Sequence, residues 1–203
     1  MPVAIVLAGL GFGLSLIIVI GAQNAYVLRQ GLRREHVVPV VAICSISDAV
    51  LITAGVGGLG ALVDAAPKAL DVLSVVGAAF LLAYAIIAAR RAVRPEVLRA
   101  ETTGKAVSIR RVVATAMALT WLNPHVYLDT VLLLGSVARS HGDDRWWFAL
   151  GAVLGSILWF SALGFGARLL QPVFARPMAW RVLDTLIAAL MIAIAVRLLT
   201  DVF

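Results

Sequence analysis

The sequence has few charged residues. Lys, Arg, Asp and Glu make up 14% of its 203 residues, whereas soluble domains carry about a quarter. Apolar residues make up 62% and are spread along the whole chain. This composition excludes an ordinary soluble domain and is typical of a protein that crosses a membrane several times.

Cysteine and catalytic motifs are also scarce. Cys44 is the only cysteine, so no disulfide can form within the chain. Neither an HExxH nor a GxSxG motif is present, and no strand accompanies the glycines as a phosphate-binding loop would require. We therefore expect neither enzymatic activity nor a cofactor. The GxxxG pairs at 9–13 and 151–155 are instead expected to let helices approach closely.

Six segments are apolar and reach the roughly 20 residues that a membrane-spanning helix needs. They are residues 3–28, 37–63, 70–89, 112–138, 146–167 and 178–200. The first lacks the basic start of a secretion signal and is too long for one, so we expect it to be retained. The sequence predicts an all-α polytopic membrane protein with a single transmembrane domain over residues 1–203.

The basic residues are unevenly divided between the two sides of the membrane. Thirteen of the 17 Lys and Arg lie in or beside the first, third and fifth connectors, and four lie on the other side. Basic residues collect in cytoplasmic loops, which predicts both termini outside and a cytoplasmic loop at 92–110. This confinement to connectors argues against a nucleic-acid partner despite the net charge of +6. The loop is expected to set the topology, and the alternative is that it also binds anionic lipid or a regulator.

The second half of the chain repeats the first in a weak internal match. Residues 72–85 align without a gap with 182–195, Asp48 aligns with Ser156, and Asn24 aligns with Asn123. Each unit contains three spans, which is an odd number, so the two copies enter the membrane from opposite sides. We predict an inverted repeat with repeat one at 1–91 and repeat two at 111–203.

A polar break lies in the stretch 119–129, LTWLNPHVYLD. Pro124 removes one helical hydrogen bond and pushes Asn123 away from helical conformation. Gln23 and Asn24 occupy the corresponding place in the first repeat. Because transporters with inverted repeats bind substrate at such discontinuous helices, these residues are predicted to form a site. The alternative is a packing kink at Pro124 with Asn123 bonded to a neighbouring helix.

Two aspartates lie inside the predicted spans. Asp48 follows the start of its segment by about 16 Å, close to the bilayer centre. Asp129 lies one helical turn after His125, on the same face. A carboxylate at this depth costs about 2.5 to 3.5 kcal/mol, and no Lys or Arg is expected there because Arg197 can reach outward. A cation or a proton is therefore the expected partner. Alternatively, Asp48 is kept neutral by a nearby hydroxyl of Ser45, Ser47 or Thr53.

Four stretches resemble the LysE/ArgO family of basic amino acid exporters. They are IGAQNAYVLRQGLRRE at 20–35, CSISDAVLITAGVGG at 44–58, GAAFLLAYA at 77–85 and LTWLNPHVYLDTVLLLGS at 119–136. The resemblance covers nearly the whole chain. It implies export of L-lysine, L-arginine or both across the bacterial plasma membrane, driven by the electrochemical gradient. It also implies functional roles for Gln23, Asn24, Asp48, Asn123, Pro124 and Asp129.

This chain departs from the family pattern in two places. Ala22 stands where many members have proline, and the central loop lacks the long acidic insertion of some relatives. The first departure predicts a softer break in the first repeat. The second puts regulation through the loop in doubt.

The residues and the resemblance lead to one hypothesis. Helices that begin after Asn24 and Pro124 offer free N–H groups to the substrate carboxylate, while Asp48 and Asp129 face its cationic groups. The expected partners are a cationic amino acid, protons and membrane lipids, with a homo-oligomer left open. Two rivals are export of neutral amino acids, and a divalent-metal carrier using Asp48, Asp129 and His125 or a non-transporting membrane subunit.

Overall fold

The structure is a computed structural model that describes residues 2–18, 21–59, 67–93, 108–174 and 176–202. These residues form helices and short turns, with no strand among them. The prediction of an all-α protein is confirmed for this part of the chain. Most of the predicted loop 92–110 lies outside the described residues.

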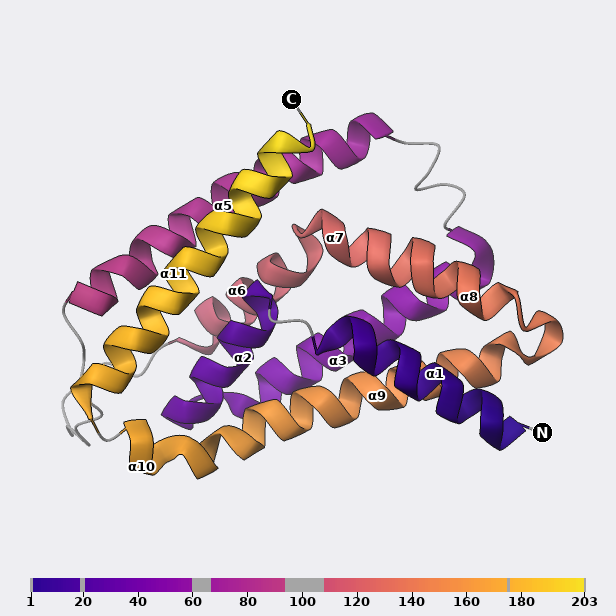
Figure 1. Ribbon diagram of the computed structural model, residues 1–203, viewed down its shortest axis with the longest axis horizontal. Coiled ribbons are helices and arrows are strands. Elements are labelled where there is room, and N and C mark those ends of the chain that lie inside the picture. The colour runs from indigo at the N-terminus through magenta and orange to yellow at the C-terminus, as the bar shows by residue number, and fades with distance from the viewer. Residues whose placement is uncertain (1, 19–20, 60–66, 94–107, 175, 203) are drawn as a thin grey trace.

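The helices fall into two series along the chain (Figure 1). The first series contains α1 Pro2–Ile17, α2 Ala22–Arg33, α3 Val37–Ala54, the π-helix η1 Gly55–Leu59 and α5 Pro67–Val93. The second series begins with α6 Ile109–Trp121, α7 Pro124–Val126, the π-helix η2 Tyr127–Leu134 and α8 Gly135–Arg139. It continues with the 3₁₀ turn η3 Gly142–Asp144, α9 Arg145–Gly166, the 3₁₀ turn η4 Ala167–Leu170, α10 Gln171–Phe174 and α11 Pro177–Thr200.

Among the described residues, four helical stretches are long and apolar enough to cross a membrane, and α1 with α2 gives a fifth if this bent pair is one span. The four are Val37–Leu59, Lys68–Val93, Gly142–Phe174 and Pro177–Thr200. The axes of α1 and α2 bend by 87° at the break between them. The predicted span 112–138 is interrupted after Trp121, so neither piece reaches spanning length by itself. Both segments that were predicted to be discontinuous, 3–28 and 112–138, are thus broken in the structure.

Equivalent helices of the two series run in opposite directions. Figure 1 shows α5 and α11 side by side and antiparallel, and α3 and α9 also run in opposite senses. The two pieces of each broken segment approach each other near the middle of the molecule. This holds for α1 with α2 and for α6 with α7. This arrangement brings both breaks toward the centre, next to α3 and α9.

Close packing of α1 on α9 depends on the predicted glycines. A Cβ at Gly13 would lie 3.0 Å from the Cα of Ala152, and one at Gly155 would lie 3.2 Å from the carbonyl oxygen of Leu10. Side chains at Gly9 and Gly151 would likewise collide with the facing backbone. The expectation that both GxxxG pairs serve helix packing is confirmed.

The two π-helices also pack against each other through glycine. A Cβ at Gly55 would come within 2.6 Å of the carbonyl oxygen of Val131, and Gly135 faces Gly55 equally closely. The guanidinium of Arg139 donates to the carbonyl of Gly55 at 3.0 Å. These contacts fix η2, which carries Asp129, against the end of α3.

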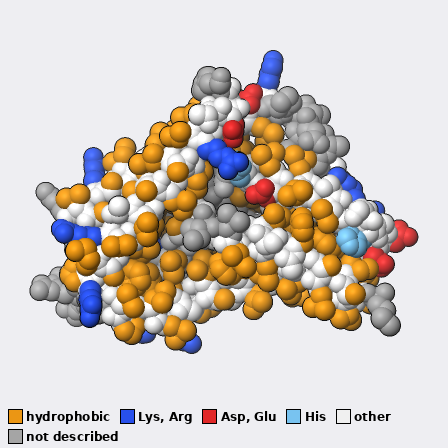
Figure 2. Space-filling model, viewed as in Figure 1, with side chains coloured by type: hydrophobic (Ala, Val, Ile, Leu, Met, Phe, Trp, Pro, Cys, Tyr) orange, Lys and Arg blue, Asp and Glu red, His pale blue; other side chains and the backbone are white. Residues whose placement is uncertain are grey.

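The surface is largely apolar. Large side chains such as Leu7, Val38, Ile46 and Leu186 are at least 60% exposed. In Figure 2 apolar side chains cover most of the face in view, and a small group of charged side chains stands near its middle. Such a surface is stable in lipid and would aggregate in water.

Candidate functional site

A central cavity of about 410 Å³ opens where the two broken segments meet α3, α9 and α11. Six of the seven predicted site residues line it: Gln23, Asn24, Asp48, Asn123, His125 and Asp129. Pro124 is buried at the first position of α7 and does not itself line the cavity. Residues from both halves of the chain thus meet at one place, as the predicted pairing of the two breaks requires.

The first break ends at Gly21, the residue before α2. No side chain caps this helix, and its first residues Ala22, Gln23 and Asn24 line the cavity. The amide of Asn24 spans the break by donating to the carbonyl of Ile17 at 2.7 Å. Asn24 also accepts from the indole N–H of Trp159 at 3.3 Å. Helix α2 therefore begins two residues before Asn24, earlier than the sequence suggested, and a proline at Ala22 is not needed for the break.

Gln23 adds a hydrogen-bond donor to this wall. Its amide nitrogen Nε2 is buried and has no hydrogen-bond partner among the described residues. A buried donor without a partner is costly unless a ligand or water accepts from it. Together with the uncapped N–H groups and the positive end of the helix dipole, Gln23 makes the start of α2 suited to an anionic group.

At the second break the helix start is capped by a side chain, unlike the start of α2. Asn123 caps α7, its side-chain oxygen accepting from the N–H of His125 at 3.2 Å. The hydroxyl of Tyr127 donates to the carbonyl of Trp121 at 2.9 Å, and the N–H of Asn123 donates to the carbonyl of Thr120 at 3.4 Å. The expected free N–H groups after Pro124 are thus partly used within the protein. The start of α2 is the better anion-binding end.

Asp48 is buried in the wall of the cavity. It is 6% exposed, and its carboxylate accepts from the hydroxyl of Ser156 at 2.7 Å. Ser156 is the residue that the internal repeat aligns with Asp48. The three hydroxyls near Asp48 in sequence are placed differently: Thr53 donates to the carbonyl of Ala49, Ser47 accepts from the indole of Trp121, and the buried hydroxyl of Ser45 has no hydrogen-bond partner among the described residues. The partner comes from the other half of the chain.

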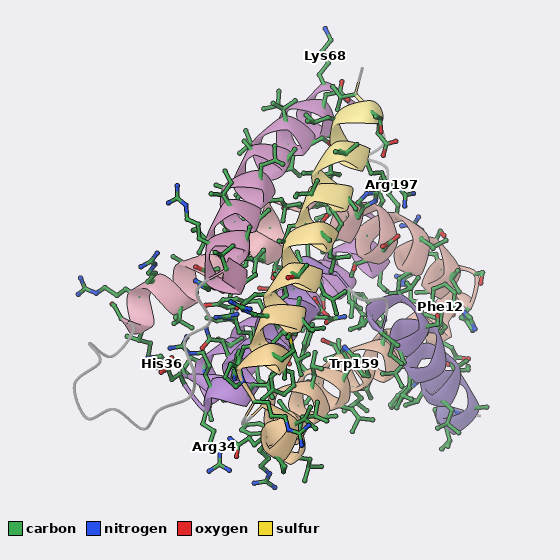
Figure 3. All side chains as sticks on the ribbon, turned by 60° about the vertical axis from the view of Figure 1, so that its left-hand side comes forward. Phe12, Arg34, His36, Lys68, Trp159 and Arg197 are labelled. Atoms are coloured by element: carbon green, nitrogen blue, oxygen red, sulfur yellow. The ribbon has the colours of Figure 1, made fainter. Side chains whose placement is uncertain are left out.

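Asp129 lies on η2 and is exposed at the mouth of the cavity. His125 and Arg197 are close enough to act on its charge. Both line the same cavity, and Figure 3 shows Arg197 extending from α11 toward the segment that contains α7. The expectation that no basic side chain accompanies the aspartates is wrong for Asp129, because Arg197 turns toward the cavity instead of outward. Sequence reasoning missed it because a lone arginine near a span's end usually reaches the interface.

Other lining residues were not predicted from the sequence. Phe160 of α9 and Ile194 of α11 supply apolar wall, and Thr130 adds a hydroxyl. In the described part of the chain no three His, Cys, Asp or Glu side chains gather as a metal site would require. Asp48, Asp129 and His125 are thus not gathered as a three-ligand set in this structure.

Comparison with known proteins places this geometry in context. A family model described as LysE type translocator matches residues 14–202. A Mycobacterium bovis protein, provisionally named as an amino-acid transporter, is 52% identical over 186 residues, or 92% of each chain. The lysine exporter LysE of Corynebacterium diphtheriae is 36% identical over 225 residues, covering 97% of this chain and 99% of its own. The arginine exporter protein ArgO of Serratia proteamaculans is 41% identical over 196 residues, covering 96% of each. No solved structure matches the chain.

Proposed function

Because this chain belongs to the LysE family of translocators, and is thus an integral membrane protein, we propose that it exports basic amino acids. The substrates are L-lysine, L-arginine or both, carried across the bacterial plasma membrane by secondary active transport. The names of two relatives, a lysine exporter and an arginine exporter, support this substrate class. The mycobacterial relative supports only the broader class of amino-acid transport.

One observation carries the proposal: donors and carboxylates line the same cavity. The start of α2 and the amide of Gln23 receive the α-carboxylate of the substrate. Asp48 and Asp129 face its ammonium group and its side-chain cation. Arg197 and His125 stand beside Asp129 at the mouth, so they moderate the pull of that carboxylate on a leaving cation. The cavity recognises both charges of a basic amino acid.

Transport is coupled to an entering proton. Moving a monovalent cation outward against an inside-negative potential costs about 2.3 kcal/mol per 100 mV. One proton entering in exchange cancels this electrical cost. Asp48 is the natural carrier of that proton because it is the buried carboxylate of the cavity, where a charge without a cation is unfavourable.

The proposed architecture has six crossings in two inverted repeats. Three structural features support it: the antiparallel pairing of α5 with α11, the two central breaks, and the contact between the aligned residues Asp48 and Ser156. Residues near a two-fold axis contact their own counterparts, as these two do. The broken segments α1–α2 and α6–α8 each cross once, bent or interrupted near the midplane.

A smaller cavity gives the same architecture further support. Four residues that line the smaller cavity are aligned by the internal repeat with four that line the central cavity. In order, Tyr26, Gln30, Tyr84 and Ile87 align with His125, Asp129, Ile194 and Arg197. The two cavities lie on opposite sides of the central breaks. Such a pair fits a carrier that opens its site alternately to each side.

Both termini are proposed to lie outside the cell. A cysteine replacing exposed Ser140 should react with a membrane-impermeant thiol reagent in intact cells, and one replacing exposed Ser108 should not. Cys44 is first replaced by alanine so that only the introduced thiol can react. Labelling of position 108 in intact cells, with position 140 protected, would reverse the topology.

Pro124→Ala should lower efflux roughly tenfold, the effect of losing one contact to a charged group. Alanine lets α6 continue through Asn123, which closes the break and moves His125 and Asp129. The measurement is efflux of labelled lysine and arginine with protein level checked in the membrane. Pro39→Ala, in the first turn of α3 and away from the cavity, is the matched control and should transport normally. Equal efflux in both variants would mean that Pro124 only kinks a packed helix.

The function itself is tested with purified protein in liposomes. Labelled lysine, arginine, leucine and a divalent metal ion are loaded separately, and release is followed with and without an imposed proton gradient. We expect gradient-stimulated release of lysine or arginine only. Release of leucine alone would indicate a neutral amino acid exporter, and release of the metal alone would refute amino-acid export.

A further inference from the structure

The second cavity, of about 210 Å³, has a lining unlike that of the first. It lies between the C-terminal parts of α2 and α5 and the start of α6. Figure 1 shows these helix ends together at the left-hand end of the molecule. Three of its arginines stand at helix ends: Arg33 ends α2, Arg91 lies near the end of α5, and Arg111 lies in the first turn of α6. Helix ends of membrane-spanning segments lie at the depth of lipid headgroups.

The charges of this cavity are strongly one-sided. Arg29, Arg33, Arg91 and Arg111 line it, against Glu35 alone. Arg29 is paired with Asp184, and Arg33 is paired with Glu35 at 3.1 Å. The guanidinium of Arg91 lies 6.0 Å from the ring centre of Tyr84, a contact that adds no negative charge. Among the described residues, the two ion pairs leave the charges of Arg91 and Arg111 in excess, so the described lining of the cavity is positive.

This cavity has therefore diverged from its counterpart. The repeat pairs Gln30 with Asp129 and Tyr26 with His125, so the carboxylate at the mouth of the central cavity has no equivalent here. A positive cavity without that carboxylate repels a cationic amino acid. Charge complementarity selects an anion as its ligand.

Two further features describe the anion. The side-chain oxygen of Gln30 is buried and has no hydrogen-bond partner among the described residues, so it can accept from a hydroxyl. Phe80, Ile87 and Val112 form an apolar wall beside the arginines. The ligand thus combines a negative group, a hydroxyl and an apolar part.

We propose that the second cavity binds the headgroup of an anionic phospholipid. Its phosphate diester lies between Arg91 and Arg111, a headgroup hydroxyl donates to Gln30, and an acyl chain runs along α5. Phosphatidylglycerol has this chemistry. Because α2 also supplies Gln23 and Asn24 to the central cavity, the bound lipid holds the second half of the broken first segment in place. The effect of the lipid on the central cavity rests on the proposed function, whereas lipid binding to the second cavity does not.

Two double variants separate a lipid site from a general effect of charge. Arg91→Gln with Arg111→Gln removes two lining arginines, while Arg90→Gln with Arg110→Gln removes their immediate neighbours, which do not line the cavity. Both variants lose the same charge from the same connector. Native mass spectrometry of the full chain in detergent then measures retained lipid after addition of phosphatidylglycerol, phosphatidic acid or phosphatidylcholine.

The parent protein should retain phosphatidylglycerol in preference to phosphatidylcholine. The lining variant should bind it roughly 25-fold more weakly, at about fivefold for each arginine, and the neighbour variant should match the parent. Gln30→Leu should abolish the preference for phosphatidylglycerol over phosphatidic acid, which has no headgroup hydroxyl. Equal loss in both double variants, or no loss in either, would overturn the proposal.

A free oxyanion is distinguished in a separate arm. Inorganic phosphate at millimolar concentration should neither be retained nor displace the lipid, and displacement would assign the cavity to a soluble anion. In liposomes, efflux should be faster with phosphatidylglycerol than without it for the parent and the neighbour variant only. If lipid binds selectively but no amino acid is exported, the lipid site stands and the proposed function fails.

Discussion

Replacing Asp48 with asparagine should lower the efflux of lysine and arginine by about 10- to 100-fold, the value of a hydrogen bond to a charged group. Asparagine keeps the shape of the side chain and removes the buried negative charge of the central cavity. The cavity then loses both its attraction for a cation and its group for carrying a proton. Efflux from preloaded liposomes, with equal amounts of inserted protein, measures the effect.

Two companion variants define what Asp48 contributes. Asp129→Asn should be milder, because Asp129 is exposed at the mouth and already shares its surroundings with His125 and Arg197. Ser156→Ala removes the hydrogen bond to Asp48 and leaves the carboxylate in place, so it should lower efflux less than about tenfold. Normal efflux in both aspartate variants would disprove recognition of the substrate by charge.

Asp184→Asn should destabilise the protein by about 3 to 5 kcal/mol. Asp184 of α11 is 2% exposed and forms an ion pair with Arg29 of α2, which is 4% exposed. Without the carboxylate, the buried guanidinium of Arg29 loses its ion-pair partner Asp184, although it still lies 5.6 Å from the ring centre of Trp180. The loss appears as a lower unfolding temperature of the purified protein in detergent.

Removing both charges should reverse most of this loss. The double variant Arg29→Met with Asp184→Leu replaces the pair with apolar side chains, a change that is often neutral in a protein interior. Arg33→Gln breaks the more exposed pair with Glu35 and should cost no more than about 1 kcal/mol. A loss from Asp184→Asn as small as that from Arg33→Gln would contradict a buried, structurally important pair.

The breaks could be predicted from sequence because their causes are local. Pro124 cannot continue a helix, and Asn123 before it is a good helix cap, so the second helix begins where the sequence suggests. Gly21 marks the first break in the same way, although the helix starts before Asn24. The internal alignment paired Asp48 with Ser156 without predicting a contact between them, and the structure shows that their side chains are hydrogen-bonded.

Features that depend on distant residues could not be found from the sequence. Arg29 and Asp184 are 155 positions apart, and each resembles an ordinary residue near the end of a span. The π-helix that carries Asp129 depends on packing of Gly55 against Val131, which leaves no local pattern. Arg197 joins the cavity only because α11 turns that side toward η2. The sequence thus indicated which residues gather, while tertiary packing determined their partners.

The bond between Ser156 and Asp48 limits how alike the two halves of the chain can be. If position 156 also carried aspartate, two carboxylates would lie within hydrogen-bond distance of each other. Like charges that close cannot both ionise, so the pair would have to share a proton. Serine at position 156 avoids this conflict and leaves a single acidic group at the junction. Two halves with identical residues at this contact could not pair one carboxylate with one hydroxyl donor.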